Sequence, residues 1–219
     1  MIEPLDMTLP ELRAALGPLL PGHATFDGWA PPALDAAAIE LGVPPERARI
    51  AFPEGAGQMI DAWFASVDEA MAAAFPPDRI AAMKVRERIR SLVWVRIAAV
   101  APHREALRRA LAILAFPTNL ALGSKLGWRA ADAMWRLAGD RSTDFAWYTK
   151  RLTLTGVYAS TLLALLDDES ENLADTAAFL DRRIEGVMRF EKLKAKLKPD
   201  PDNHFSPVRF LGRLRYPPA

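Results

Sequence analysis

Residues 139–166, GDRSTDFAWYTKRLTLTGVYASTLLALL, decide how the rest of the chain is interpreted. The Gly-Asp pair at the start is a typical helix stop, and one of the next hydroxyl or acidic residues can cap a new helix. The part from Leu152 to Leu166 is apolar nearly all round, as expected for a helix at the centre of a bundle. We therefore predict a long helix here, packed among other helices.

At the start of this helix an acid, two aromatics and a base lie at helical spacing. Asp144, Trp147, Tyr148 and Arg151 are three, four and seven residues apart, so they share one face of an α-helix. Two large aromatic side chains beside a cation are the composition of a protein–protein hot spot. They are also the composition of an ordinary half-buried helix, and the residues alone leave both interpretations open.

The remaining sequence also predicts helices, which proline and glycine separate. The expected helices are Leu9–Leu20, Pro32–Leu41, a segment begun by Pro44-Pro45, one through Trp63 to about Phe75, one from Asp78 to about Ala101, His103–Ala115, one from Pro117 to near Gly139, and a last long one to about Leu197. The sequence shows no alternating strand pattern and no phosphate-binding glycine loop. We predict an all-α fold: residues 1–75 form small helices with a helix–turn–helix-type pair, residues 76–199 form a larger bundle that binds a ligand, and residues 200–219 form a linker and a short amphipathic helix.

The net charge of +1 conceals an asymmetry along the chain. Residues 1–75 carry three basic and eleven acidic residues, whereas the remainder carries 25 basic and 16 acidic ones. A helix that reads DNA needs a basic surface to neutralise phosphates, so this helix–turn–helix pair is not expected to bind nucleic acid. The chain has no cysteine and no charge-free run long enough for a transmembrane helix.

The sequence contains no recognisable catalytic or metal-binding motif. The histidines His23, His103 and His204 are scattered, and the paired Glu-x-x-His motifs of helical di-iron proteins are missing. The acidic cluster at residues 167–169 lies where a helix ends, and we expect it to be a solvated turn. The sequence therefore predicts a protein that is not an enzyme and that needs neither a metal nor a cofactor.

Two segments have the composition of lipid-binding elements. Residues 206–215, taken as a helix, place apolar side chains on one arc and arginines opposite, which suits an anionic membrane surface; docking of this helix on its own bundle is an equal alternative. The predicted membrane-binding residues are Val208, Arg209, Phe210, Leu211, Arg213 and Leu214. The helix over residues 152–166 belongs either to a packed core or to the wall of an apolar ligand cavity, which would be lined by Leu152, Gly156, Ala159, Leu163 and Leu166.

Four motifs carry a resemblance to a known family. They are Phe26-Asp27-Gly28-Trp29, Phe52-Pro53-Glu54-Gly55, Phe179-Leu180-Asp181-Arg182-Arg183-Ile184 and, the most specific, Asp-Phe-Ala-Trp-Tyr-Thr-Lys-Arg at residues 144–151. Together they resemble the ubiquinone-biosynthesis accessory lipid-binding family, whose fold is similar to that of tetracycline-repressor (TetR) regulators. The resemblance implies a TetR-like fold in which the helix–turn–helix no longer serves DNA.

The same resemblance implies a function. A member would bind a lipid, either an isoprenoid quinone precursor or a phospholipid, and present it at the membrane to the di-iron demethoxyubiquinone hydroxylase. It assigns a partner-binding patch to Asp144, Trp147, Tyr148 and Arg151, with Met134 beside them. Fold analogy adds a homodimer, and the acidic start of the chain, which lacks a targeting peptide, predicts a bacterial protein at the cytoplasmic face of the inner membrane. The alternative function is a TetR-type transcriptional regulator that senses an apolar ligand.

Overall fold

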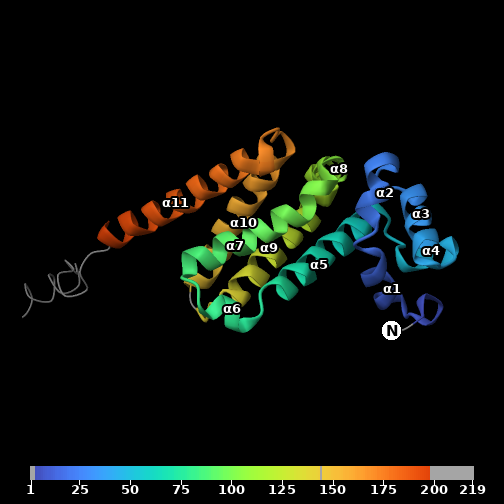
Figure 1. Cartoon of the computed structure of the whole chain (residues 1–219), viewed down its shortest axis with the longest axis horizontal. Helices are drawn as coiled ribbons and strands as arrows, with labels where there is room; N and C mark the ends of the chain where they lie inside the picture. The colour runs from blue at the N-terminus through green and yellow to red at the C-terminus, as the bar shows by residue number, and fades with distance from the viewer. Residues whose placement is uncertain (1–2, 144, 198–219) are drawn as a thin grey trace, which may run out of the picture.

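The computed structural model describes residues 3–143 and 145–197, which form an elongated helical molecule (Figure 1). The α-helices are α1 (Leu9–Leu16), α2 (Leu20–Asp27), α3 (Pro31–Leu41), α4 (Pro45–Ala51), α5 (Ala56–Ala74), α6 (Pro77–Ala81), α7 (Val85–Val100), α8 (Arg104–Ala115), α9 (Leu120–Leu137), α10 (Phe145–Leu166) and α11 (Ala174–Leu197). Short 3-10 turns lie at η1 (Pro4–Asp6), η2 (Ala101–His103), η3 (Pro117–Asn119) and η4 (Glu171–Leu173). No strand occurs in the described ranges, and the predicted all-α class is confirmed.

Helices α1 to α4 form a small unit at one end of the molecule (Figure 1). Helix α3 ends at Gly42, whose φ of 81° lies in the left-handed region that glycine adopts without strain. Pro45 occupies the first turn of α4, where its missing N–H would have no helical partner. The two residues between them turn the chain sharply, which gives the predicted helix–turn–helix-type pair.

The larger bundle consists of α5 and α7 to α11. Helices α9 and α10 pack side by side, α11 packs on α10 and α7, and α5 packs on α7 and α9. Helix α5 also contacts α1, so it runs from the small unit into the bundle (Figure 1). One continuous hydrophobic cluster extends from Leu12 in α1 to Ile184 in α11. The boundary predicted at residue 75 therefore separates α5 from α7 and α9, two of the helices on which it packs.

One expected helix is shortened and another is divided, and α2 (Leu20–Asp27) was not among the expected helices. The segment Leu9–Leu20 breaks after α1, where a Cβ added to Gly17 would lie 2.6 Å from the carbonyl oxygen of Ala62. Pro21 does not end a helix but lies in the first turn of α2. Likewise, residues 78–101 form α6 and α7, separated by a short turn.

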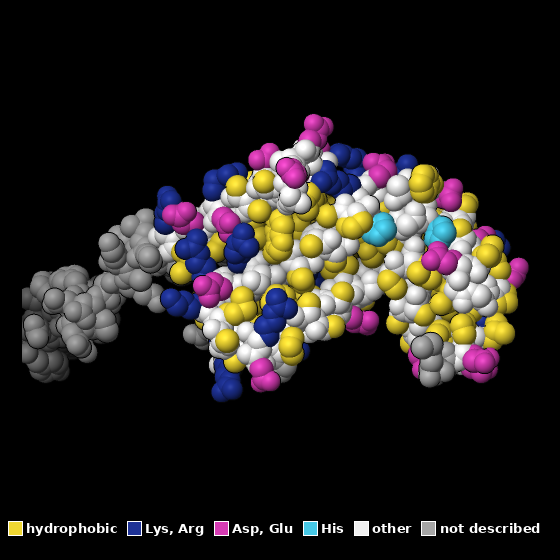
Figure 2. All heavy atoms as spheres, viewed as in Figure 1, with side chains coloured by type: hydrophobic (Ala, Val, Ile, Leu, Met, Phe, Trp, Pro, Cys, Tyr) yellow, Lys and Arg dark blue, Asp and Glu magenta, His cyan; other side chains and the backbone are white. Residues whose placement is uncertain are grey.

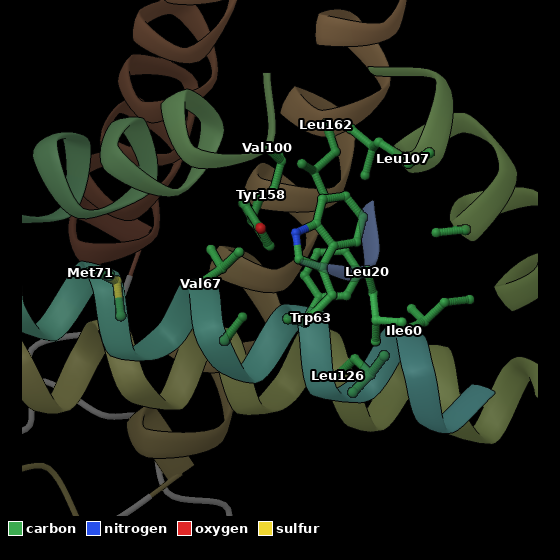
Figure 3. Packing of buried hydrophobic residues seen from close by; sticks show 14 of the residues in the cluster. Leu20, Ile60, Trp63, Val67, Met71, Val100, Leu107, Leu126, Tyr158 and Leu162 are labelled. Carbon is green, nitrogen blue, oxygen red and sulfur yellow. The ribbon is translucent and has the colours of Figure 1, made fainter. Parts of the chain in front are cut away.

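Trp29 joins the small unit to the bundle. Its indole Nε1 donates a hydrogen bond of 2.9 Å to the carbonyl oxygen of Ala106 in α8. Its ring stacks on Trp63 of α5 with 5.4 Å between centroids, inside the hydrophobic cluster that Figure 3 shows around Trp63. The motif at residues 26–29 thus has a packing role.

The acidic turn between α10 and α11 is only partly solvated, which corrects the sequence expectation. Asp167 is largely exposed, but Asp168 is 3% exposed. The carboxylate of Asp168 accepts hydrogen bonds from the hydroxyls of Ser170 and Thr176 and from the backbone N–H of both residues. Burial would raise its pKa, but these donors outweigh burial and lower it. Asp168 therefore caps the first turn of α11.

Candidate partner-docking site

Three aromatic side chains from neighbouring helices meet at the α9–α10 surface. We call Trp128 of α9 with Trp147 and Tyr148 of α10 the aromatic patch. The ring centroids of Trp128 and Trp147 lie 5.5 Å apart, those of Trp147 and Tyr148 lie 4.7 Å apart, and those of Trp128 and Tyr148 lie 6.4 Å apart. Tyr148 is 59% exposed, Trp147 is half-buried, and the neighbouring Phe145 is 78% exposed. The patch is therefore rigid aromatic surface that water still reaches.

A buried guanidinium supports the patch from below. The Arg151 side chain is 2% exposed, and its Nε donates to Asp132 Oδ1 at 2.6 Å. Its Nη1 donates to Asp140 Oδ2 at 3.0 Å and to the carbonyl oxygen of Trp147 at 3.2 Å. The guanidinium also lies 4.1 Å from the centroid of the Trp147 ring, a cation–π contact. We call Arg151, Asp132 and Asp140 the Arg151 network; it fixes the Trp147 ring against α9.

The loop between α9 and α10 is held by the same carboxylates. Lys150 Nζ donates to Asp140 Oδ1 at 2.7 Å, and the Ser142 hydroxyl donates to the same carboxyl group. Burial alone would raise the pKa of Asp140, but the hydrogen bonds from Lys150, Ser142 and Arg151 lower it to about 2. Asp140 is therefore a fixed anion near neutral pH.

The structure brings together part of the predicted partner-binding patch. Trp147 and Tyr148 lie side by side, whereas Asp144 lies outside the described residues. Met134 is 0% exposed and Arg151 is 2% exposed, so neither offers a surface to a partner. Both are corrected to buried residues, because the inner faces of α9 and α10 pack against the rest of the bundle.

The sequence analysis missed Trp128, Asp132 and Asp140 as site residues. Trp128 precedes Trp147 by nineteen residues and meets it only because α9 and α10 fold back on each other. A close approach marks the helix crossing, since a Cβ on Gly127 would lie 2.8 Å from the side chain of Thr155. Gly127, one residue before Trp128, was the feature of the sequence that could have indicated this helix crossing.

The predicted wall of an apolar cavity lies on the outside of the bundle. Leu152 is 68% exposed and Leu163 is 57% exposed, Gly156 and Ala159 are also exposed, and Leu166 is half-buried. These side chains cannot line an internal cavity, and the assignment is corrected. The opposite side of α10 faces the core through Leu154, Val157, Tyr158, Thr161, Leu162 and Leu165.

The predicted membrane-binding residues 208–214 lie outside the described residues. Within the described part of the chain, no single helix is long and apolar enough to cross a membrane; only the bent pair 85–115 and 117–137 passes by length and hydropathy. Nor do any three His, Cys, Asp or Glu side chains in the described ranges gather closely enough to hold a metal ion.

A helix that reads DNA would need free cations, but both arginines of α4 form hydrogen bonds within the protein. Arg47 donates to the carbonyl oxygens of Leu5 and Met7, and Arg49 Nε donates to Asp35 Oδ1 at 2.9 Å. On the face shown in Figure 2, most basic side chains lie over the bundle and few over the small unit. The charge asymmetry of the sequence is thus also an asymmetry in space.

The comparison with known proteins concerns the segment that holds the aromatic patch. Residues 120–191 match the model of the COQ9 family. The resemblance to that family is confirmed. The rat mitochondrial ubiquinone biosynthesis protein COQ9 is 38% identical over 115 residues, 52% of this chain and 37% of the rat protein. A probable COQ9 of Dictyostelium discoideum is 27% identical over 173 residues, 76% of this chain and 56% of that protein. The matches thus span about a third of the length of the vertebrate COQ9 proteins.

The fold has a counterpart among solved structures. A TetR transcriptional regulator from Nitrosomonas europaea superposes with a TM-score of 0.64 and 24% sequence identity, over 82% of this chain and 99% of the regulator. At this identity the likeness concerns the fold alone, and it confirms the predicted TetR-like architecture.

The comparison with the COQ9 relatives shows that the predicted location is wrong. A bacterial protein at the cytoplasmic face of the inner membrane was expected, but the COQ9 relatives from rat, human, Dictyostelium and fission yeast are named as mitochondrial. The expectation rested on the acidic first residues, and so short a stretch carries little information about a compartment.

Proposed function

We propose that this protein is a non-catalytic accessory protein of ubiquinone biosynthesis. In this role it binds an isoprenoid quinone precursor or a phospholipid and presents it at a membrane to the di-iron demethoxyubiquinone hydroxylase. The observation that carries the proposal is the aromatic patch, which lies within the segment matching the COQ9 family.

The patch has the physical properties of a docking surface. Trp and Tyr contribute most to binding when they lie rigidly at the centre of an interface. Here Trp147 is held before any partner arrives, by Arg151 on its ring and by Trp128 at its side. Little side-chain entropy remains to be lost on binding, so most of the contact area of the patch contributes to affinity.

Alanine substitution within the patch tests the docking role. Tyr148→Ala should weaken binding of the purified hydroxylase about tenfold to a hundredfold, measured by surface plasmon resonance, because an exposed aromatic anchor is lost. Its far-UV circular dichroism spectrum should not change, since the side chain is mostly in solvent.

Phe26→Ala is the matched control. Phe26 is 82% exposed and lies in the small unit, outside the patch, so its removal should leave hydroxylase binding unchanged. Equal binding by wild type and Tyr148→Ala would contradict a docking role for the patch.

A homodimer is part of the proposal. The exposed side of α10 carries Leu152 and Leu163 with Gly156 between them, and a Cβ on Gly156 would meet nothing within 4 Å. A second copy of the chain fits this face, because leucines flanking a small residue let two helices approach closely. Leu152→Glu should convert a dimer to a monomer in analytical ultracentrifugation; a wild-type monomer would remove this part of the proposal.

The TetR-like fold favours a second candidate, a transcriptional regulator that senses an apolar ligand. The engaged arginines of α4 and the acidic residues 1–75 argue against it. A gel-shift assay with the upstream DNA of the encoding gene at low salt distinguishes the two. A salt-sensitive shift at nanomolar protein would favour the regulator.

A further inference from the structure

The connection between α8 and α9 is free of charge, which is uncommon for a turn at the surface of a protein. Residues 110–124 carry no charged side chain, and the first charges beyond the two ends of this run are cations, Arg109 and Lys125. The chain turns by 91° within this run, between residues 115 and 117. Connections between helices are normally polar because water surrounds them. We call residues 110–124 the apolar corner.

The two bulkiest exposed side chains of the apolar corner lie at the bend itself. Phe116, between the helices, is 63% exposed, and Leu120, in the first turn of α9, is 54% exposed. The other exposed side chains of the corner are small and uncharged: Ala112, Ala115, Pro117, Thr118, Ala121 and Ser124. Exposed apolar surface with charges only at its border is typical of a site that meets a partner or a membrane.

The backbone at the bend is hydrogen-bonded within the protein. The Phe116 N–H donates to the carbonyl oxygen of Ile113 at 3.2 Å, and the Asn119 N–H donates to the carbonyl oxygen of Phe116 at 2.8 Å. The side-chain Nδ2 of Asn119 donates to the same Ile113 oxygen at 2.9 Å, and Pro117 has no N–H. Polar backbone groups can leave water at little cost only when they have such partners. This bend can therefore enter an apolar medium without losing hydrogen bonds to water at these groups.

The residue types of the corner favour a lipid surface over a protein partner. A protein-binding hot spot has tryptophan, tyrosine or arginine at its centre, as the aromatic patch does, and residues 110–124 contain none of these. The bordering cations have long side chains that remain accessible: Arg108 is 50% exposed and Lys125 is 68% exposed, with its Nζ 3.8 Å from Asp61. Lysine and arginine beside inserted apolar residues can extend to the headgroups of anionic lipids.

We propose that the apolar corner inserts into the interface of an anionic lipid bilayer, with Phe116 and Leu120 as the inserted side chains. This inference rests on the proposed function at a membrane and names the face of the bundle that meets the bilayer. Only the corner enters, because α9 continues with Arg129, which pairs with Asp61 of α5 inside the bundle. None of its residues belongs to the predicted membrane-binding segment 208–214.

A fluorescent probe at the bend tests insertion directly. The chain has no cysteine, so Phe116→Cys carries the environment-sensitive fluorophore NBD at a single position of the full-length protein. With vesicles of mixed phosphatidylcholine and phosphatidylglycerol, its emission should shift to the blue and be quenched by spin-labelled lipid, because the probe leaves water. Ile50→Cys with the same probe, at a 63% exposed position of α4, is the matched control and should show neither change.

Flotation with the same vesicles measures how much the corner contributes to binding. Phe116→Ser combined with Leu120→Ser should lower the partition coefficient about tenfold, because two bulky apolar side chains no longer enter the bilayer. Ile39→Ser combined with Ile50→Ser removes two similarly exposed side chains from the small unit and should float as wild type does. Far-UV circular dichroism should not distinguish the two variants from wild type.

Each failure has a separate meaning. If wild type floats while the probe at residue 116 stays in water, or if the Phe116–Leu120 variant floats equally well, the inference is wrong and the membrane contact lies on another surface. A shift of the probe with purified hydroxylase but not with vesicles would assign the corner to a protein partner and overturn the inference as well. Failure of wild type to float would instead contradict the proposed function at a membrane.

Discussion

Two helix pairs of this molecule, α3–α4 and α9–α10, end their first helix in the same way, on a glycine with positive φ. The angle is 81° at Gly42 and 85° at Gly139. Arginines follow each turn, but their side chains are used differently. In α4, Arg47 bonds to nearby carbonyls and Arg49 to the half-buried carboxylate of Asp35, so neither arginine is free to bind phosphate. In α10, Arg151 is buried and holds an aromatic ring at the surface.

The comparison teaches that the presence of a structural motif does not determine which groups remain free for a partner. A helix–turn–helix pair whose cations are bonded within the chain has little to offer DNA. A helix hairpin whose charges are buried can instead present an apolar, rigid surface to another protein. The predictions below test this difference, from the largest expected effect to the smallest.

Removing the buried arginine should have the largest effect. Arg151→Met should lower the free energy of unfolding by about 3 kcal/mol, because the half-buried Asp132 and the buried carboxylate of Asp140 lose the cation that they share. Urea denaturation followed by circular dichroism measures this loss. Arg49→Met, which breaks the pair between the exposed Arg49 of α4 and Asp35 of α3, should leave the midpoint nearly unchanged. Equal losses in the two variants would break the proposed distinction.

The Arg151 network should also make stability depend on acid. Folding lowers the pKa of Asp140 from 3.8 to about 2, so the charged carboxylate stabilises the folded state at all pH values above its unfolded pKa. This contribution, about 2 kcal/mol by linkage, is lost as the pH falls from about 4 to about 2. Thermal unfolding of wild type and Asp140→Asn over this range should show the gap between them closing. A gap that does not change with pH would show that Asp140 is not held by charge.

Replacing the glycines that end α3 and α9 should change stability by a smaller amount. Gly42→Ala and Gly139→Ala should each cost about 1 kcal/mol of stability, because alanine is strained at positive φ. Only Gly139→Ala should also weaken hydroxylase binding, since it shifts the loop that positions Asp140 beneath the patch. Calorimetry and binding measurements on both variants check this. Equal binding losses would place the docking surface elsewhere.

The order of the helices was predicted from the prolines and glycines that begin and end them. The errors in this prediction have simple causes. Proline at a first helical turn and glycine at a stop were interpreted correctly at Pro45 and Gly42. The break at Gly17 was missed although the local sequence signals it, because Pro18 follows Gly17 and has no backbone N–H to donate within a helix.

The site was less accessible to sequence analysis. Helical spacing correctly placed Trp147, Tyr148 and Arg151 on one side of α10, but it did not indicate how deeply each side chain is buried. Both sides of residues 152–166 are apolar, so periodicity did not indicate which side faces the core. The exposed side was assigned to the ligand cavity, whereas the side that carries Leu154, Tyr158 and Leu162 faces the core.

The sequence by itself determined the all-helical class, the acidic front and basic remainder, and the motif at residues 144–151 that carries the family resemblance. Each of these depends on residue type and local spacing. Only the tertiary structure decided that Trp128 meets Trp147, that Arg151 is buried, and that Arg96 pairs with Asp68 in the core. The physical reason is that helical periodicity defines the faces of a helix, whereas burial depends on distant segments that pack against each face.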